Sequence, residues 1–350
     1  MLKYSFGIDI SKNDFHSCLS AIDANQQVKV KASRKFSNNL QGFKEMLIWL
    51  TRHRKEVNVP LVVTMEATGV YFESCAMFLF KAGLQVSVVL PNKAKKYMAA
   101  IGLKTKNDKI DAFGLARMGA EQSLALWQPM DEFFYTLRSL TRHHQSLQEL
   151  KTNVSNQLHA DEHSIYSNKK VMKQLKKLIG TIEKELLETG REIDKQLYSD
   201  PEIAKKVRHI TEMKGMGNLT VATILAETNG FALFTSIGQV VSFAGYDVVE
   251  NQSGKRTGNT KISKKGNSHI RRALHMPAFN VVRYNTGNFK TFFARILSRH
   301  GQKMKAYVAV QKKLLVLIYT LWKKNEAFMP QGPESIKNTS GEKELVPSFA

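Results

Sequence analysis

The chain has 350 residues, of which 43% are hydrophobic, enough for about two domains with real cores. Its 52 Lys and Arg residues against 30 Asp and Glu give a formal net charge of +22, which predicts a polyanionic partner, most simply nucleic acid. The two cysteines have no metal-site or disulfide spacing, and no apolar run approaches the ~20 residues of a membrane span. These features predict a cytoplasmic, nucleoid-associated protein without a membrane role.

The first third of the chain predicts alternating strands and helices. Three strands fall within residues 4–36, and Asn38 or Asn39 caps a helix whose apolar residues recur at helical spacing. The later elements are a strand at 61–65, a helix entered through Gly69, a strand at 85–90 closed by Pro91, and a helix from Asp108. An antiparallel meander that leads into parallel strands is the succession of an α/β RNase H-like (RuvC-like) fold, predicted here for residues 1–128.

Residues 129–203 predict a helical arm. Apolar residues are spaced by threes, fours and sevens with charged residues between them, and a polar break at 164–169 divides the pattern. We expect a helical hairpin or coiled coil that serves oligomerisation, or else two helices within one bundle. The apolar positions are Leu137, Leu140, Leu147, Leu150, Val154, Leu158, Val171, Leu175, Leu178, Ile182, Leu186, Ile193 and Leu197.

Residues 204–325 predict a second compact domain, mostly α-helical, with a helix-hairpin-helix-like segment. In that segment Met213-Lys-Gly-Met-Gly217 leads into an apolar helix. A Gly-x-Gly turn before a helix offers free backbone N–H groups to a phosphate, and it equally fits a glycine that ends the preceding helix. The remaining residues, 326–350, are rich in Pro, Gly, Ser and charge, which predicts a disordered tail.

Four carboxylates are the strongest functional signal. Asp9 and Glu66 end apolar strand-like runs, where a buried carboxylate is costly unless a cation or a donor meets it. Asp108 and Asp111 are three apart at the start of a helical pattern, so both point to one face. Strand-end acids with a helix-borne pair can hold two Mg²⁺ ions for phosphodiester chemistry, because Mg²⁺ prefers carboxylate oxygens. We therefore predict that all four are catalytic metal ligands.

Other interpretations fit parts of this pattern. Asp108 and Asp111 by themselves would suit the positive end of a helix dipole. The run Gly7-Ile-Asp9 also opens the phosphate loop of actin-like ATPases, but the further Gly and Thr of that loop do not follow. His159 and His163 could share a helical face as metal ligands, although a solvated surface pair is the commoner outcome.

A strongly basic segment follows a Ser-Gly dipeptide. Its seven cations, with no acid among them, are predicted to bind nucleic acid: Lys255, Arg256, Lys261, Lys264, Lys265, Arg271 and Arg272. Ser253, at the head of this segment, becomes a phosphoryl nucleophile if cations stabilise the transition state and another group takes its proton. An ordinary Ser-Gly hairpin turn beside a phosphate-binding patch fits the same spacing.

With these residues in place, the chain resembles the DEDD transposases of the insertion-sequence 110 family, which includes the Piv-type DNA invertases and the bridge-RNA-guided recombinases. The resemblance is collinear over residues 4–322. It is carried by the segments Gly7-Ile-Asp-Ile-Ser11, Met65-Glu-Ala-Thr-Gly-Val-Tyr71, Asn107-Asp-Lys-Ile-Asp-Ala-Phe-Gly-Leu-Ala116, Ser242-Phe-Ala-Gly-Tyr-Asp-Val-Val-Glu-Asn-Gln-Ser-Gly254 and Lys261-Ile-Ser-Lys-Lys-Gly-Asn-Ser-His-Ile-Arg-Arg-Ala-Leu274. It implies a RuvC-like domain whose four acids bind Mg²⁺ and a transposase domain in which Ser253 attacks the scissile DNA phosphate.

The resemblance also implies partners and an assembly. A transient phosphoserine link would form at Ser253, and acids of a partner subunit would complete the site. A structured noncoding RNA would pair with double-stranded donor and target DNA, and homodimers would assemble into a tetramer. Two segments depart from the family pattern: Met213-Lys-Gly-Met-Gly217 replaces the usual Ile-Pro-Gly-Ile-Gly, and Tyr246-Asp-Val248 replaces a Leu and a nearby Pro.

The expected function is therefore a Mg²⁺-dependent DNA transposase or site-specific recombinase. The first alternative is a RuvC-like nuclease that hydrolyses DNA with metal-activated water and forms no covalent intermediate. The second alternative is a nucleic-acid-binding protein without catalysis.

Overall fold

The computed structural model describes residues 1–103, 105, 107–250, 252–253, 256–258, 260–284, 286 and 288–329. The chain divides into two compact units, Met1–Pro129 and Met130–Ala350, and each unit has its own hydrophobic core. Within the described residues, none of the helices combines the length and the apolar character needed to cross a bilayer.

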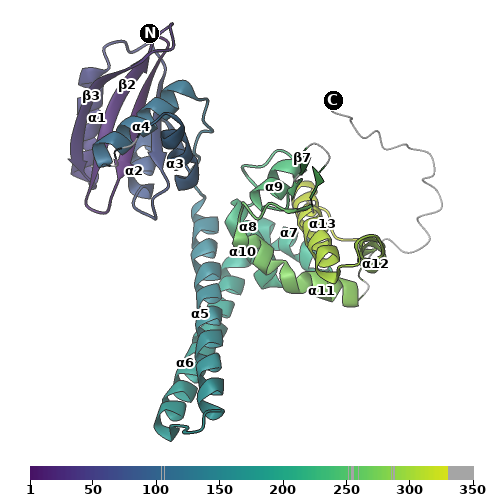
Figure 1. Ribbon diagram of the computed structural model, residues 1–350. Helices are drawn as coiled ribbons and strands as arrows, with labels where there is room; N and C mark the ends of the chain where they lie inside the picture. The colour runs from purple at the N-terminus through teal and green to yellow at the C-terminus, as the bar shows by residue number, and fades with distance from the viewer. Residues whose placement is uncertain are drawn as a thin grey trace, which may run out of the picture. The chain divides into compact units, whose positions relative to one another are not determined.

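Unit 1 is built on a five-stranded sheet in the order β3-β2-β1-β4-β5 (Figure 1). The strands are β1 (Lys3–Ile10), β2 (Asp14–Ile22), β3 (Val28–Ser37), β4 (Leu61–Glu66) and β5 (Gln85–Val89), and the helices are α1 (Leu40–His53), α2 (Glu73–Lys81), α3 (Pro91–Ala100) and α4 (Asp108–Glu121). The first three strands form an antiparallel meander, and β4 and β5 continue the sheet in parallel. The predicted RNase H-like strand succession is therefore confirmed.

The two faces of this sheet carry different side chains, because residues alternate sides along each strand. Phe6 and Ile8 of β1 belong to a large apolar core that includes Phe43 and Trp49 of α1. The opposite face of β1 carries small residues and is covered by α4, which lies across the sheet in Figure 1. One face thus supplies the stability of the unit, and the other seats a single helix.

The sequence predicted the start of α1 correctly but did not predict α3. Asn39, one of the two predicted caps, caps α1, with its side-chain oxygen accepting from the Gly42 N–H at 2.9 Å. The helix α3 was missed. Pro91, which was read only as the end of a strand, is the first residue of α3, where proline is favoured because its missing N–H is not needed.

The arm of unit 2 is a pair of long helices, α5 (Glu132–Glu162) and α6 (Lys169–Leu197), which pack side by side (Figure 1). Leu147, Val154 and Ile182 are buried between them. The structure therefore contains the predicted helical hairpin, with its break at the predicted place. Its description as a coiled coil and its role in oligomerisation stay predictions.

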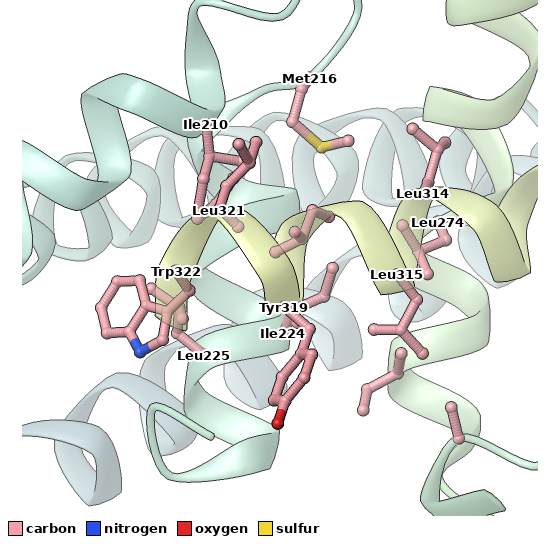
Figure 2. Packing of buried hydrophobic residues seen from close by; sticks show 14 of the residues in the cluster. Ile210, Met216, Ile224, Leu225, Leu274, Leu314, Leu315, Tyr319, Leu321 and Trp322 are labelled. Carbon is pink, nitrogen blue, oxygen red and sulfur yellow. The ribbon is translucent and has the colours of Figure 1, made fainter. Parts of the chain in front are cut away.

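The rest of unit 2 is mostly helical around one core. Its helices are α7 (Pro201–Thr211), α8 (Asn218–Thr228), α9 (Ile237–Phe243), α10 (Ser268–Ala273), α11 (His275–Arg283), α12 (Phe289–His300) and α13 (Lys303–Lys324). Figure 2 shows apolar residues of α13, among them Leu321 and Trp322, gathered with Ile210 of α7 and Leu225 of α8. The helix α13 therefore forms the centre of this core.

The chain continues past α13 for a few described residues. Asn325 ends α13 in a left-handed conformation, and the backbone N–H of Phe328 donates to the carbonyl of His209 at 3.1 Å. Phe328 also packs against the core of unit 2. Residues 326–328 therefore contact the core of unit 2, and the disorder expected from residue 326 onward stays a prediction. Residues 330–350 of the predicted tail lie outside the described residues.

Candidate active site

The first two predicted acids lie side by side at one end of the sheet of unit 1. Ile8 of β1 is in register with Met65 of the parallel strand β4, so the next residues, Asp9 and Glu66, are also neighbours. In adjacent strands, residues in register point to the same face. Both carboxylates are half-buried. Strand register therefore places these two acids on neighbouring strands, and their role as metal ligands stays a prediction.

The other two acids reach this place because α4 lies very close to the sheet. A Cβ added to Gly7 would lie 2.1 Å from the carbonyl oxygen of Ala112, and one added to Gly119, later in the helix, would lie 2.5 Å from the Oγ atom of Ser5, which is earlier in β1. The helix thus runs antiparallel to β1. A strand advances about 3.3 Å per residue and a helix about 1.5 Å, so two strand residues match about four helix residues. Asp9 is two residues beyond Gly7 and is therefore level with the first turn of α4.

The first turn of α4 holds both remaining acids, on two adjoining stripes. Asp108 continues the stripe of small residues that contacts β1, and its Oδ2 atom lies 3.6 Å from the Nδ1 atom of His16. His16 is the cross-strand partner of Asp9, so Asp108 lies on the side of Asp9. Asp111 shares its stripe with Leu115, which packs with Val89, the neighbour of Glu66. All four predicted acids thus belong to one end of one face.

This arrangement is not a finished ligand shell. Within the part of the chain that the structure describes, no three His, Cys, Asp or Glu side chains lie close enough together to hold a metal ion. The donor chemistry nevertheless fits a divalent cation such as Mg²⁺, since four carboxylates supply the oxygen ligands that Mg²⁺ prefers. The metal ion and the four ligand roles therefore stay predictions.

Ser253 lies in unit 2, on a narrow ribbon of short strands. In this ribbon β6 (Val248–Val249) pairs with β9 (Lys261–Ile262), and β7 (Gln252–Ser253) pairs with β8 (Arg256–Thr257). Ser253 is in register with Arg256, so the backbone of the predicted nucleophile is paired with that of a predicted DNA-binding residue. Gly254 and Lys255, which connect them, lie outside the described residues.

The base of this ribbon is tied down by two residues of the basic segment. The guanidinium Nη1 atom of Arg271 donates to the carbonyl oxygens of Ala244 at 2.8 Å and of Gly266 at 3.1 Å. Asn267 caps α10 through the N–H of His269 and also donates its backbone N–H to Phe243 at 2.7 Å. The residues just before the ribbon, Phe243 and Ala244, are therefore hydrogen-bonded to the residues just after it, Asn267 and Arg271.

Family models match both units of the chain. Residues 6–161 match the DEDD domain model of IS110 transposases, described as a transposase, and residues 207–294 match the model described as transposase of the IS116/IS110/IS902 family. The chain is also 29% identical to the pilin gene-inverting protein of Moraxella bovis and 28% identical to that of Moraxella lacunata. Each of these matches covers 94% of this chain and 98% of the relative.

The chain belongs to the IS110 transposase family. It is accordingly a DNA recombinase enzyme. Among solved structures, Thermus thermophilus RuvC is similar over 35% of this chain and 99% of its own, with 16% identity and a TM-score of 0.28.

The structure also assigns contacts to the other predicted cations of this transposase. Arg272 forms an ion pair with Glu149 of α5, whereas the exposed Lys261, Lys264 and Lys265 form no ion pair with any described residue. Among the cations whose side chains the structure describes, Arg271 and Arg272 therefore have structural partners, and a role in nucleic-acid binding stays a prediction for all seven.

The structure also shows the Gly-x-Gly turn and the histidine pair of this transposase. Gly215 has a positive φ of 102°, and Gly217 precedes α8 without a side-chain cap, so the Gly-x-Gly turn does enter a helix. Phosphate binding by that turn stays a prediction. The rings of His159 and His163 stack at 4.2 Å between centroids, and the Nδ1 atom of His163 contacts the carbonyl oxygen of His159 at 2.8 Å.

Sequence reasoning missed a clamp at the acid end of the transposase. The side-chain amide of Asn38 donates to the carbonyl oxygens of Ser11 at 2.8 Å and Tyr71 at 3.2 Å, and its backbone N–H donates to Asn13 at 2.8 Å. Ser11 is two residues after Asp9, and Tyr71 is five after Glu66. Asn38 therefore joins the two loops that follow the strand acids. The asparagine was visible in the sequence only as an alternative helix cap.

A buried carboxylate in unit 2 was also missed. The side chain of Glu227 on α8 is fully buried, and it accepts from Arg142 at 2.7 and 3.0 Å and from Asn267 at 2.6 Å. Burial alone would raise the pKa of Glu227, but the hydrogen bonds from Arg142 and Asn267 and the charge of Arg138 hold this pKa below its ordinary value. Glu227 thereby connects α5 to the base of the Ser253 ribbon.

Proposed function

We propose that this transposase cleaves and rejoins DNA strands through Ser253, in a reaction that depends on Mg²⁺ held by Asp9, Glu66, Asp108 and Asp111. The observation that carries the proposal is the placement of four carboxylates at one end of the face covered by α4. Four carboxylates supply the oxygen ligands that Mg²⁺ prefers, and a divalent cation would offset the repulsion among them.

The proposed reaction assigns a task to each unit. The Ser253 oxygen bonds to the scissile phosphorus and loses its proton, while the bond to the leaving DNA oxygen breaks and that oxygen gains a proton. Mg²⁺ bound by the four acids would supply charge stabilisation to the transferring phosphate. The cations near Ser253 hold the DNA backbone, and Arg271 and Asn267 keep the ribbon in place.

The assembly and the RNA partner are also part of the proposal. Leu150, Leu178 and Leu187 of the arm are 51%, 47% and 67% exposed, which supports a role of this arm in joining subunits into dimers and a tetramer. The basic segment supports binding of DNA and of a structured guide RNA. The pilin gene-inverting relatives support a site-specific reaction, either DNA inversion or transposition.

The experiment that tests the proposal is capture of the covalent intermediate. Full-length protein, Mg²⁺ and labelled substrate DNA are mixed and quenched with denaturant, and the expected product is a protein–DNA adduct that survives denaturation. Ser253→Ala should abolish both the adduct and the cleavage. Undiminished cleavage by Ser253→Ala would instead establish hydrolysis by activated water, the RuvC-like alternative.

A further inference from the structure

The C-terminal part of unit 2 is basic far beyond the segment around Ser253. Between Asn251 and Asn325 the sequence contains seventeen Lys and Arg residues and not one Asp or Glu. Most of the formal net charge of +22 therefore comes from this stretch. A cationic surface without anions is costly through self-repulsion, and an external polyanion removes that cost.

Part of this charge surrounds a cleft of about 760 Å³, which we name the α12–α13 cleft. Lys305, Lys312 and Lys313 line it from α13, and Lys261 and Lys264 line it from the end of the Ser253 ribbon. Positions 305, 312 and 313 lie on one side of a helix, because seven residues make two turns. None of the described residues that line this cleft is acidic.

Among the described residues, the lysines of the cleft have no ion-pair partner. The lysine ion pairs found in the described residues involve Lys29, Lys35, Lys151, Lys176, Lys195 and Lys324, none of which lines the cleft. The Lys313 ammonium lies 4.6 Å from the centre of the Phe292 ring, a weak contact that leaves its charge available. These lysines are therefore available to bind an external anion, since no described residue neutralises them.

The floor of the cleft is apolar. It is lined by four half-buried apolar residues, whereas most of the lysines are exposed: Phe292 and Ile296 of α12, and Val308 and Val316 of α13. A cationic rim around an apolar floor suits an unpaired nucleotide, whose phosphate is anionic and whose base is flat and apolar on both faces. A duplex offers such a site only its phosphates, since its bases are stacked inside.

The position of the cleft indicates which strand it holds. Val248 of β6 and Ile262 of β9, the first pair of the ribbon, line it directly. Ser253 is five residues after Val248, so at most ~18 Å of extended chain separates them. A strand bound in the cleft therefore lies within reach of the predicted nucleophile. We propose that the α12–α13 cleft binds unpaired nucleotides of the DNA substrate next to the scissile phosphate. This choice of strand rests on the proposed function.

The test is direct binding, measured without cleavage. Full-length protein carrying Ser253→Ala, in EDTA, is titrated into a labelled single-stranded oligodeoxynucleotide or its duplex, and anisotropy is followed across a salt series. The double change Lys312→Gln/Lys313→Gln should raise the single-strand Kd about tenfold and lower the salt slope by about 1.4, at roughly 0.7 per lost phosphate contact. Duplex binding should change much less.

Matched variants separate the cleft from general charge. Lys323→Gln/Lys324→Gln removes the same charge from the same helix outside the cleft, and it should leave single-strand binding nearly unchanged. Val308→Thr makes the floor polar without changing the shape of the side chain. It should weaken binding of the single strand and leave duplex binding unchanged. The proposal would be overturned if the two double-lysine variants lost the same affinity, or if duplex and single strand lost the same affinity. A marked preference for RNA of the same sequence would also overturn it. Because no cleavage is measured, a failure of the Ser253 chemistry would be seen separately, in the adduct experiment.

Discussion

The acid end of unit 1 and the Ser253 ribbon of unit 2 hold their predicted functional residues in place by different means. The acids are fixed by regular structure, because strand register sets Asp9 beside Glu66 and a close-packed helix sets Asp108 and Asp111. The ribbon has only two-residue strands, and side-chain hydrogen bonds from Arg271 and Asn267 anchor its base. Substitutions should therefore disturb the first region through backbone clashes. They should disturb the second region by removing polar contacts.

The largest expected effect is on the acid end. Asp9→Asn should lower single-turnover DNA cleavage by about 10³-fold or more, because several kcal/mol of charge stabilisation depend on the metal ion. The thermal unfolding temperature should stay nearly the same, and calorimetric titration should show weaker Mg²⁺ binding. Asp23→Asn is the matched control, since Asp23 caps a turn at the opposite end of β2. An Asp9→Asn enzyme at full rate would remove Asp9 from the proposed site.

The next effect concerns the anchor of the ribbon. Glu227→Gln should lower the unfolding free energy by about 3 kcal/mol, because Arg142 loses its charged partner and buried ion pairs cost about that much to break. Urea unfolding measures the change. Glu149→Gln breaks the exposed pair with Arg272 and should leave stability unchanged within error. A stable Glu227→Gln protein would mean that the buried pair is dispensable.

The same carboxylate predicts a pH dependence. Its pKa is lower in the fold than the ordinary value of 4.5, so Glu227 adds stability above that value. This contribution is lost as the pH falls through the lowered pKa of the folded state. In urea unfolding between about pH 5 and pH 3, wild-type protein should therefore lose more stability than Glu227→Gln. Parallel pH profiles would contradict a lowered pKa.

A smaller effect tests the close approach of α4. Gly7→Ala should lower the unfolding free energy by about 2 kcal/mol, since the new Cβ would clash with backbone atoms of Ala112 and Ala116 that cannot easily move. It should also weaken Mg²⁺ binding, because α4 carries two of the acids. Gly180→Ala on α6 meets nothing within 4 Å and should instead stabilise the protein by up to about 1 kcal/mol. The same substitution is thus expected to act with opposite sign in the two units.

The smallest effect separates two adjacent asparagines. Asn38→Ala should slow cleavage roughly tenfold, since two hydrogen bonds of about 1 kcal/mol each hold the loops after the strand acids. Asn39→Ala should lower stability by about 1 kcal/mol through loss of the α1 cap, with little change in rate. The unfolding free energy and the single-turnover cleavage rate of both variants distinguish these two roles. Identical behaviour of the two would show that Asn38 acts only on stability.

The sequence predicted most of the fold because its signals are local. Alternating apolar residues mark β1, and helical spacing with a polar break marks the arm. The strand order agrees with those predictions, and the role of the four acids as a ligand set stays a prediction. The helix α3 was missed because Pro91 marks a helix start as readily as a strand end.

The polar contacts were not predictable, because they join distant segments. Glu227 meets Arg142, which is 85 residues away, and Arg271 meets Ala244, 27 residues away. In the sequence, Arg271 looked like any other cation of a DNA-binding segment. Asn38 and Asn39 could not be told apart either, because only the fold determines which of them faces the loops and which faces the helix.

The acid-free stretch between Asn251 and Asn325 has a practical consequence for handling the protein. At low ionic strength it should retain cellular nucleic acid through purification, and a high-salt wash should strip this contaminant. The stripped protein should melt at a lower temperature, and heparin or another inert polyanion should restore the loss, because a ligand that binds only the folded state stabilises it.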